Sequence, residues 1–479
     1  MSFDPQVIIQ NLEALVLDLG SRHPAEIMAI LFLKGGWVIF VFVIIRGLWW
    51  IYVDNIQGKY LGSVQWALLA IDIPKENLQS VKAVEHLFAA MWPFYESKNL
   101  VEKYVDGKFQ LAFSLEIVSI GGYTQFLIRV PRSHKDIVEA AVYAQYPKAE
   151  ISEVEDYALR YKNLKFPSEE HDLWGSEFTL AKPSPYPIKT YPSFEDKLTQ
   201  TFADPMASML EVFNKIGKEE ELWMQLIITP IKDGWKKEGY KVINKMIGAK
   251  TEGGSDSGLL TTILSPLHYI ANLAHEFIIY GLGYEMGKEE KIAKENGLPN
   301  KMLYLTPEER NVIDGITMKI SKIAYQTKLR IVYLGKKGKL VKPRGAGASI
   351  GMLHQFTAVD QNSFMPIMKT MTKANYFFVK KRVTAKQNNI LRNFINRSQT
   401  GGWGAGFILN IEELASIYHF PVPEAVREGV KRVESKKEAP PVDLPDTVFE
   451  EQNSQDNFED YMVASRESVK AEPPANLPV

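Results

Sequence analysis

The pattern of apolar and polar positions begins with a long apolar run near the N-terminus. Residues 27–53 are apolar apart from Lys34 and Arg46, and a helix of this length exceeds the roughly 30 Å hydrocarbon core of a bilayer. Acidic residues precede the run and no small-x-small cleavage site follows it, which argues against a signal peptide. We expect a single transmembrane helix at 27–53 after a short segment at 1–26, with a buried or interfacial helix as the alternative. The basic residues that follow favour a cell-membrane protein with a cytoplasmic body.

Residues 62–156 then alternate between strand-like and helix-like patterns in the order βαββαβ. Apolar and polar residues alternate on both sides of Gly121-Gly122, which predicts two strands, each with one buried face, joined as a hairpin. Apolar residues recur with helical spacing at 81–91 and 137–144. This order predicts a ferredoxin-like α+β domain, whose sheet keeps one face for helices.

The second half of the chain repeats this mixed pattern with insertions. Residues 157–192 are irregular and rich in proline, so we expect a linker there. A second α+β domain is expected at 193–425, with a helical insertion around 231–305. Prolines and acids dominate residues 433–479, which predicts a disordered acidic tail. The predicted fold class is therefore α+β: an N-terminal transmembrane helix, then ferredoxin-like modules with helical insertions, then a disordered C-terminal tail.

Two helix starts in the second half carry local capping signals. Thr306 and Glu309 flank a proline at the first helical position, and Asn410 stands three residues before Glu413. In such pairs the first side chain accepts from the backbone of the second residue, and the second side chain reaches back to the cap. We expect a helix to begin at each of these places.

The charge of the chain is balanced overall but divided unevenly along it. The 479 residues contain 56 basic and 57 acidic side chains, for a net charge of −1. Residues 433–479 hold 11 acids and 4 bases, a net charge of −7, so the preceding 432 residues carry +6. Residues 315–410 hold 17 lysines and arginines and one acid, Asp360. This long basic stretch predicts an anionic partner.

Nucleic acid is the partner that this stretch fits best. Phosphate binding needs several cationic side chains on one surface, and neighbouring aromatic rings can stack on unpaired bases. Tyr376, Phe377 and Phe378 lie beside the second group of basic residues. Anionic lipid, an acidic protein, the acidic tail in cis and a merely solvated face are the alternatives. The candidate nucleic-acid-binding residues are Lys336, Lys337, Lys339, Lys342, Arg344, Lys380, Lys381, Arg382, Lys386, Arg392 and Arg397.

Motifs of known catalytic and metal sites are incomplete. The chain has no G-x-x-x-x-G-K-[ST] nucleotide loop and no cysteine, and His275-Glu276 lacks the second histidine of a zinc-protease helix. A serine hydrolase using Ser349, Asp360 and His419 is the enzymatic alternative, because Ser349 stands in a G-x-S-x-G arrangement. That arrangement needs a strand directly before the serine, and a basic, glycine-rich segment occupies this place instead. We expect no enzyme, no catalytic residue, no metal and no cofactor.

Two segments of the second half carry a family resemblance. Residues Leu305–Gly335 and Ile408–Pro421 resemble segments of membrane-anchored proteins related to type IV secretion and conjugative DNA-transfer systems. The resemblance implies a non-ATPase accessory or scaffold component of a DNA-translocation machine. Its implied partners are the membrane, DNA, a separate DNA-pumping ATPase and a further copy of the chain. A structural membrane protein without nucleic-acid contact is the remaining alternative.

Overall fold

A computed structural model of the chain describes residues 26, 32–33, 37–74, 79–195, 202–248 and 305–421. Most of the short segment expected at 1–26 and of the insertion expected around 231–305 lies outside these residues. The acidic tail expected at 433–479 lies wholly outside them. Everything described below therefore belongs to the part of the chain that ends at Pro421.

The transmembrane helix predicted for residues 27–53 is wrong. Within the described ranges, no helix is both long enough and apolar enough to cross a membrane. The helix described in this region, α3 (Trp37–Ser63), contains Arg46 and continues into a polar stretch with Asp54 and Lys59. The single-pass topology and the membrane localisation that we inferred from the apolar run lose their basis.

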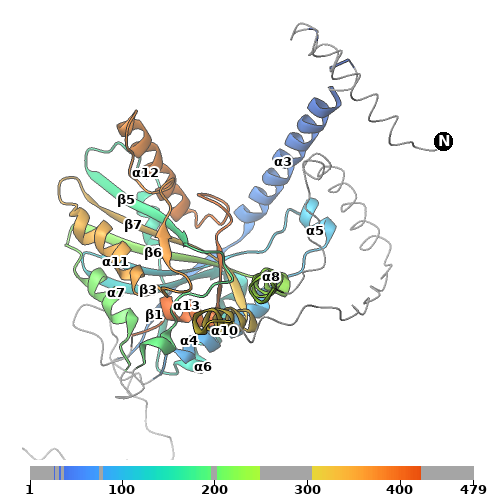
Figure 1. Cartoon of the computed structure of the whole chain (residues 1–479). Helices are drawn as coiled ribbons and strands as arrows, with labels where there is room; N and C mark the ends of the chain where they lie inside the picture. The colour runs from blue at the N-terminus through green and yellow to red at the C-terminus, as the bar shows by residue number, and fades with distance from the viewer. Residues whose placement is uncertain are drawn as a thin grey trace, which may run out of the picture. The chain divides into compact units, whose positions relative to one another are not determined.

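The described strands form one sheet with antiparallel neighbours throughout (Figure 1). Their order is β4-β1-β3-β2-β6-β7-β5-β8, and β9 pairs with β7. The second half, β6-β7-β5-β8, mirrors the order of the first. The strands are β1 (Trp66–Asp72), β2 (Phe113–Ile120), β3 (Tyr123–Pro131), β4 (Glu150–Glu153), β5 (His171–Leu180), β6 (Glu220–Pro230), β7 (Ala324–Lys336), β8 (Phe364–Pro366) and β9 (Phe407–Asn410).

This continuous sheet corrects the predicted fold class. The fold is a mixed α/β fold built on one large antiparallel sheet, and separate ferredoxin-like modules are not shown. The strand β2 pairs with β6 along its whole length, from Phe113 opposite Ile228 to Ile120 opposite Glu221, so the two halves share one sheet. The segment 157–192, predicted as a linker, contains β5, which lies between β7 and β8. Alternating polarity locates a strand but does not identify its neighbour.

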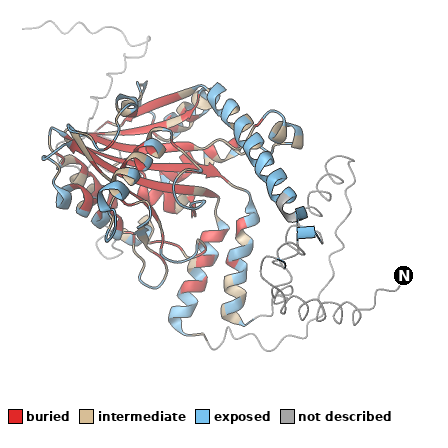
Figure 2. Ribbon diagram, turned by 90° about the horizontal axis from the view of Figure 1, so that it is seen from above, coloured by how far each residue is buried: buried red, intermediate tan, exposed pale blue. Residues whose placement is uncertain are grey.

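Helices cover both faces of the sheet, and the core lies between the layers. One face packs against α4 (Lys82–Met91), α6 (Lys135–Gln145), α7 (Pro205–Asn214), α11 (Ala348–His354) and α13 (Ile411–Ile417). The other face packs against α12 (Val379–Ile395) and the short helix η4 (Tyr157–Tyr161). Figure 2 shows the strands as buried over most of their length. Because both faces are covered, the polar side chains that the strands bury, such as Glu116 and Arg330, need partners inside the protein.

The remaining described helices lie outside these two layers. The helices α8 (Lys236–Ile247) and α10 (Pro307–Ser321) pack against each other around Ile316 and Ile320. The short helix α5 (Leu100–Tyr104) contacts α3, because Tyr52 donates to the Tyr104 carbonyl at 3.0 Å. Both predicted capping boxes are confirmed, at the starts of α10 and α13.

Candidate nucleic-acid interface

The first group of candidate basic residues follows β7. Lys336 is the last residue of that strand and contacts Glu219 at 2.5 Å. Arg344, in the short helical segment η8 (Pro343–Gly347), forms an ion pair with the buried Glu220 at 2.9 Å. Lys337, Lys339 and Lys342 are exposed. Two of these five cations are therefore already neutralised by acids of the sheet, which weakens this group as a phosphate site.

Arg397 is not available to an external phosphate. Its side chain is buried, and its Nε donates to Glu116 Oε1 at 2.9 Å while its other nitrogens bind Glu116 and Asp156. Burial lowers the pKa of Arg397, but Glu116 outweighs that effect and raises the pKa above its ordinary value. A count of charges along the sequence misses this pairing, because Glu116 lies 281 positions away.

The second group lies on α12, whose Gln387 donates to the Asp172 carboxylate at 2.8 Å. Lys380, Lys381 and Arg382 are exposed on the first turn of the helix, and Arg392 is exposed near its end. Among the described residues, none of these four cations forms an ion pair, nor does the half-buried Lys386 of the same helix. The sequence contains no acid between Asp360 and Glu412. The described part of the chain therefore leaves the positive charge of this helix without a neutralising acid.

Three aromatic rings lie exposed directly before α12. Tyr376, Phe377 and Phe378 are 90%, 81% and 76% exposed. Tyr376 and Phe378 have φ angles of +68° and +52°, in the left-handed region that costs non-glycine residues about 1–2 kcal/mol. A costly backbone that presents three apolar rings to solvent is typical of a binding surface. We call residues 373–382 the aromatic–basic tip.

A strap of residues 367–373 fixes the tip to the edge of β5. Backbone hydrogen bonds join Ile367 to Glu177 and Thr372 to Gly175, at 2.8 Å and 3.0 Å. On the other side, Lys386 Nζ donates to the carbonyls of Met368 and Lys373, at 2.9 Å and 2.8 Å. The tip is therefore held between the sheet and the second turn of α12, so its rings are presented by an ordered scaffold.

The first turn of α12 offers a further feature that suits an anion. Its N-cap residue, Phe378, provides no side-chain acceptor for the first backbone N–H groups. Such groups at a helix N-terminus attract phosphate through their direction and the helix dipole. The cationic side chains of Lys380 and Lys381 emerge at the same place. Together they form a compact cationic site beside the rings.

A buried polar row under α12 orders the loop that follows this helix. Glu116, Gln225, Arg330 and Glu177 lie opposite one another in register on four adjacent strands, β2, β6, β7 and β5. Arg330 Nε donates to Glu177 at 2.8 Å and its Nη1 donates to the Asn393 carbonyl in the last turn of α12. Its Nη2 donates to the carbonyls of Ser398 and Gly401, in the loop after α12. Burial lowers the pKa of Arg330, which nevertheless keeps a carboxylate partner. The row couples the sheet to residues 396–403.

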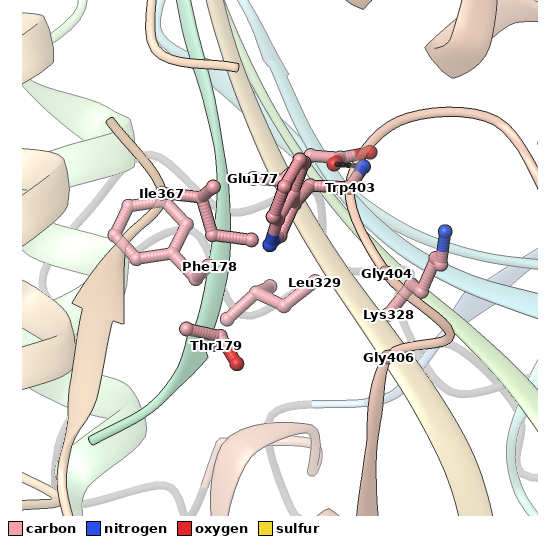
Figure 3. Close-up of a pocket in the computed structure, with 9 residues that line it drawn as sticks. All are labelled: Glu177, Phe178, Thr179, Lys328, Leu329, Ile367, Trp403, Gly404 and Gly406. Carbon is pink, nitrogen blue, oxygen red and sulfur yellow. Dashed lines mark hydrogen bonds between the residues drawn. The ribbon is translucent and has the colours of Figure 1, made fainter. Parts of the chain in front are cut away.

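A small pocket opens where this loop meets the sheet (Figure 3). It has a volume of about 200 Å³. Along one edge of β7, residues 329–336 pair with β5 and residues 324–327 pair with β9. Lys328 therefore lies where the two neighbouring strands of β7 diverge, as in a fork. The lining residues are Glu177, Phe178, Thr179, Lys328, Leu329, Ile367, Trp403, Gly404 and Gly406. We call this cavity the fork pocket.

Sequence reasoning missed Trp403, although the sequence carried a signal for it. Trp403 is 48% exposed and lies within a run of glycines, and Lys369 Nζ is 3.5 Å from the centroid of its ring. A lone tryptophan among glycines has no core to fill, so such a run is a reason to examine a loop for binding. Lys369 belongs to the strap, and the pocket and the tip are therefore joined by one segment.

The residues of the hydrolase alternative do not come together. Ser349 is fully buried in α11 and its hydroxyl donates to the Gly345 carbonyl. His419 is also buried and contacts Asp204 and the Ala415 carbonyl, each at 2.8 Å. These contacts use the groups that a triad would need, so this geometry does not support a hydrolase. Within the described part of the chain, no cluster of three or more potential metal ligands occurs.

Comparison with known proteins identifies a family whose function is not known. No curated protein matches the chain. The sequence profile of a family described as "Domain of unknown function (DUF8128)" matches residues 73–430, which include the tip, the fork pocket and the described strands from β2 to β9, but not β1. The chain belongs to this family.

Proposed function

We propose that this protein binds single-stranded nucleic acid at the aromatic–basic tip. The observation that carries the proposal is the position of Tyr376, Phe377 and Phe378, all largely exposed, directly before the unpaired cations Lys380, Lys381 and Arg382. Rings that stack on bases and cations that neutralise phosphates are the two components of single-strand binding sites.

The rings favour a single strand over a duplex. Bases in a duplex are already stacked and paired, so their faces are not available to protein side chains, whereas unpaired bases stack on an exposed ring for about 1–3 kcal/mol each. Stacking tolerates any base, and contacts to phosphate carry no sequence information. Binding is therefore expected to show little sequence preference and a strong dependence on salt.

The wider role rests on the resemblance of Leu305–Gly335 and Ile408–Pro421 to segments from DNA-transfer systems. A single-strand-binding protein without a nucleotide loop suits the non-motor component of such a machine, acting beside a separate DNA-pumping ATPase. This role needs no membrane-spanning helix in the chain itself.

The test compares two triple variants of the full chain with equal changes of charge. In the first, Lys380, Lys381 and Arg382 become alanine. In the control, Lys336, Lys337 and Lys339 become alanine. Fluorescence anisotropy of a labelled single-stranded oligonucleotide of mixed sequence, titrated between about 50 and 200 mM salt, gives log K against log salt for each protein.

The tip variant should bind more weakly, and its salt slope should fall by about two units, since each phosphate neutralised on a single strand contributes about 0.7. The control variant should keep most of the slope, because Lys336 is already paired with Glu219. Equal losses in both variants would show that only total charge matters. Absence of wild-type binding at about 50 mM salt would refute the function.

A further inference from the structure

We propose that the fork pocket accepts one base of the strand that the tip binds. This inference rests on the proposed function and adds a second, separate contact to it. The strap connects the two sites, because Ile367 lines the pocket and Lys373 begins the tip. Six residue steps reach at most about 20 Å, and turn hydrogen bonds from Thr370 and Met371 to the Ile367 carbonyl shorten the strap further, so one short strand can reach both sites.

The walls of the pocket suit a flat aromatic ring. Leu329, Ile367 and the indole of Trp403 surround the opening in Figure 3, and the Thr179 hydroxyl lies at its lower edge. The volume of about 200 Å³ is below the 300–1,000 Å³ of pockets for drug-sized ligands. A single ring system with polar edges is the ligand class that fits these dimensions and this chemistry.

The loop that forms the outer wall of the pocket has two glycine positions at which a side chain would clash. Gly402 has φ +93°, and a Cβ there would lie 1.9 Å from Glu177 Oε1. Gly406 has φ +90°, and a Cβ there would lie 2.4 Å from the Thr327 carbonyl oxygen. The Trp403 backbone N–H donates to Glu177 Oε2 at 2.7 Å. Glycine and the buried row thus fix the backbone of Trp403 while its side chain remains half-exposed at the mouth of the pocket.

Charge around the mouth favours a nucleotide over a neutral ring. Lys369 lies over the Trp403 ring, and Lys328 Nζ donates to the Gly401 carbonyl at 2.9 Å. Burial lowers the pKa of Lys328, with Glu177 opposing that effect. A base that enters beside Trp403 brings its phosphate towards Lys369 and the strap. Lys369 is therefore placed for the phosphate and the indole for the base, while the buried Lys328 holds the loop through the Gly401 carbonyl.

The experiment uses the full chain and a 12-residue single-stranded probe containing one 2-aminopurine, whose fluorescence falls when the base stacks. The variants are Trp403→Ala, Trp403→Phe and, as a control that keeps the pocket walls, Lys369→Met. The Trp403 side chain is half-exposed, so Trp403→Ala should fold. Trp403→Phe keeps an aromatic ring at this position and serves as the second variant if Trp403→Ala does not fold. Free 2-aminopurine nucleotide and N-acetylphenylalaninamide serve as competitors.

Wild type should quench the probe. Trp403→Ala should lose the part of the quenching that the pocket adds to that of the tip, and should bind about five-fold to a hundred-fold more weakly. Trp403→Phe should keep most of the quenching and of the affinity. Lys369→Met should weaken binding with quenching retained. If wild type binds the probe and Trp403→Ala shows the same affinity and the same quenching, the pocket does not accept a base, while the proposed function stands. Absence of probe binding by wild type would overturn the proposed function, and with it this inference. Displacement of the probe by N-acetylphenylalaninamide would show that the pocket accepts a peptide side chain, and would overturn the proposal that it accepts a base.

Discussion

Replacing Arg330 by methionine should destabilise the protein far more than replacing any exposed lysine of the same strand. The Arg330 side chain is fully buried and donates to Glu177, Gln225 and three main-chain carbonyls, at distances from 2.6 to 3.4 Å. Methionine fills similar space but leaves the Glu177 carboxylate buried without its cation. Removing one partner of a buried pair costs about 3–5 kcal/mol, a large fraction of the stability of an ordinary domain.

Urea unfolding followed by circular dichroism measures this cost. With m values of a few kcal/mol/M for a protein of this size, the midpoint should fall by roughly 1 M or more. Lys336→Met is the matched control, because Lys336 lies on the same strand in an exposed ion pair, and its midpoint should stay near that of wild type. Adding Glu177→Leu to Arg330→Met should cost less than the sum of the single changes. An Arg330→Met midpoint equal to that of Lys336→Met would refute the role of the polar row.

Two further outcomes follow from the charges. Burial raises the pKa of Glu116, but Arg397 and hydrogen bonds from Ser114 and Tyr157 outweigh burial and lower the pKa below the ordinary 4.5. The ionised Glu116 therefore stabilises the fold above about pH 4.5, and this contribution is lost as the pH falls through the lowered pKa. The difference in stability between wild type and Glu116→Gln, measured from urea midpoints, should shrink as the pH falls from about 6 to about 3. Comparing the two proteins cancels the opposite effect of Glu413, whose pKa is raised by burial. A constant difference would contradict the pairing of Glu116 with Arg397. Deleting residues 433–479 removes a net charge of −7 and should raise the affinity for single strands at low salt; unchanged affinity would show that the tail does not screen the tip.

The sequence predicted those features that local chemistry determines. The caps at Thr306 and Asn410 need only residues within one turn, and both are present. The Gly121-Gly122 turn joins β2 and β3 in the expected hairpin, with both glycines at positive φ. The exposed cations and rings before and within α12 were also identified, because a run without acids is visible in the sequence alone.

Long-range pairing was beyond such reasoning. The second neighbour of β2, beside its hairpin partner β3, is β6, about 110 residues away, and nothing local specifies it. Glu116 lies on the face of its strand that the alternation leaves polar, whereas Arg397 and Gln225 cover it. The same effect placed Arg397 among the surface candidates. Buried polar residues that are paired from distant segments look like surface residues until the fold is known.

The apolar run near the N-terminus shows the opposite error. Length and hydropathy favoured a membrane span, but the described helix takes in only part of that run and extends into polar residues. The fork pocket was missed for a further reason, since its walls come from β5, β7, the strap and the loop after α12. No short motif contains these residues together.

The central claim is that exposed rings at the tip stack on unpaired bases, and one comparison tests it most directly. Affinity of the full chain for a single strand and for a duplex of the same sequence is measured for wild type and for a variant in which Tyr376, Phe377 and Phe378 are leucine. All three rings are largely exposed, so folding should be unchanged. The account predicts a loss of about ten-fold or more for the single strand and little change for the duplex. Equal affinities of variant and wild type for the single strand would contradict it.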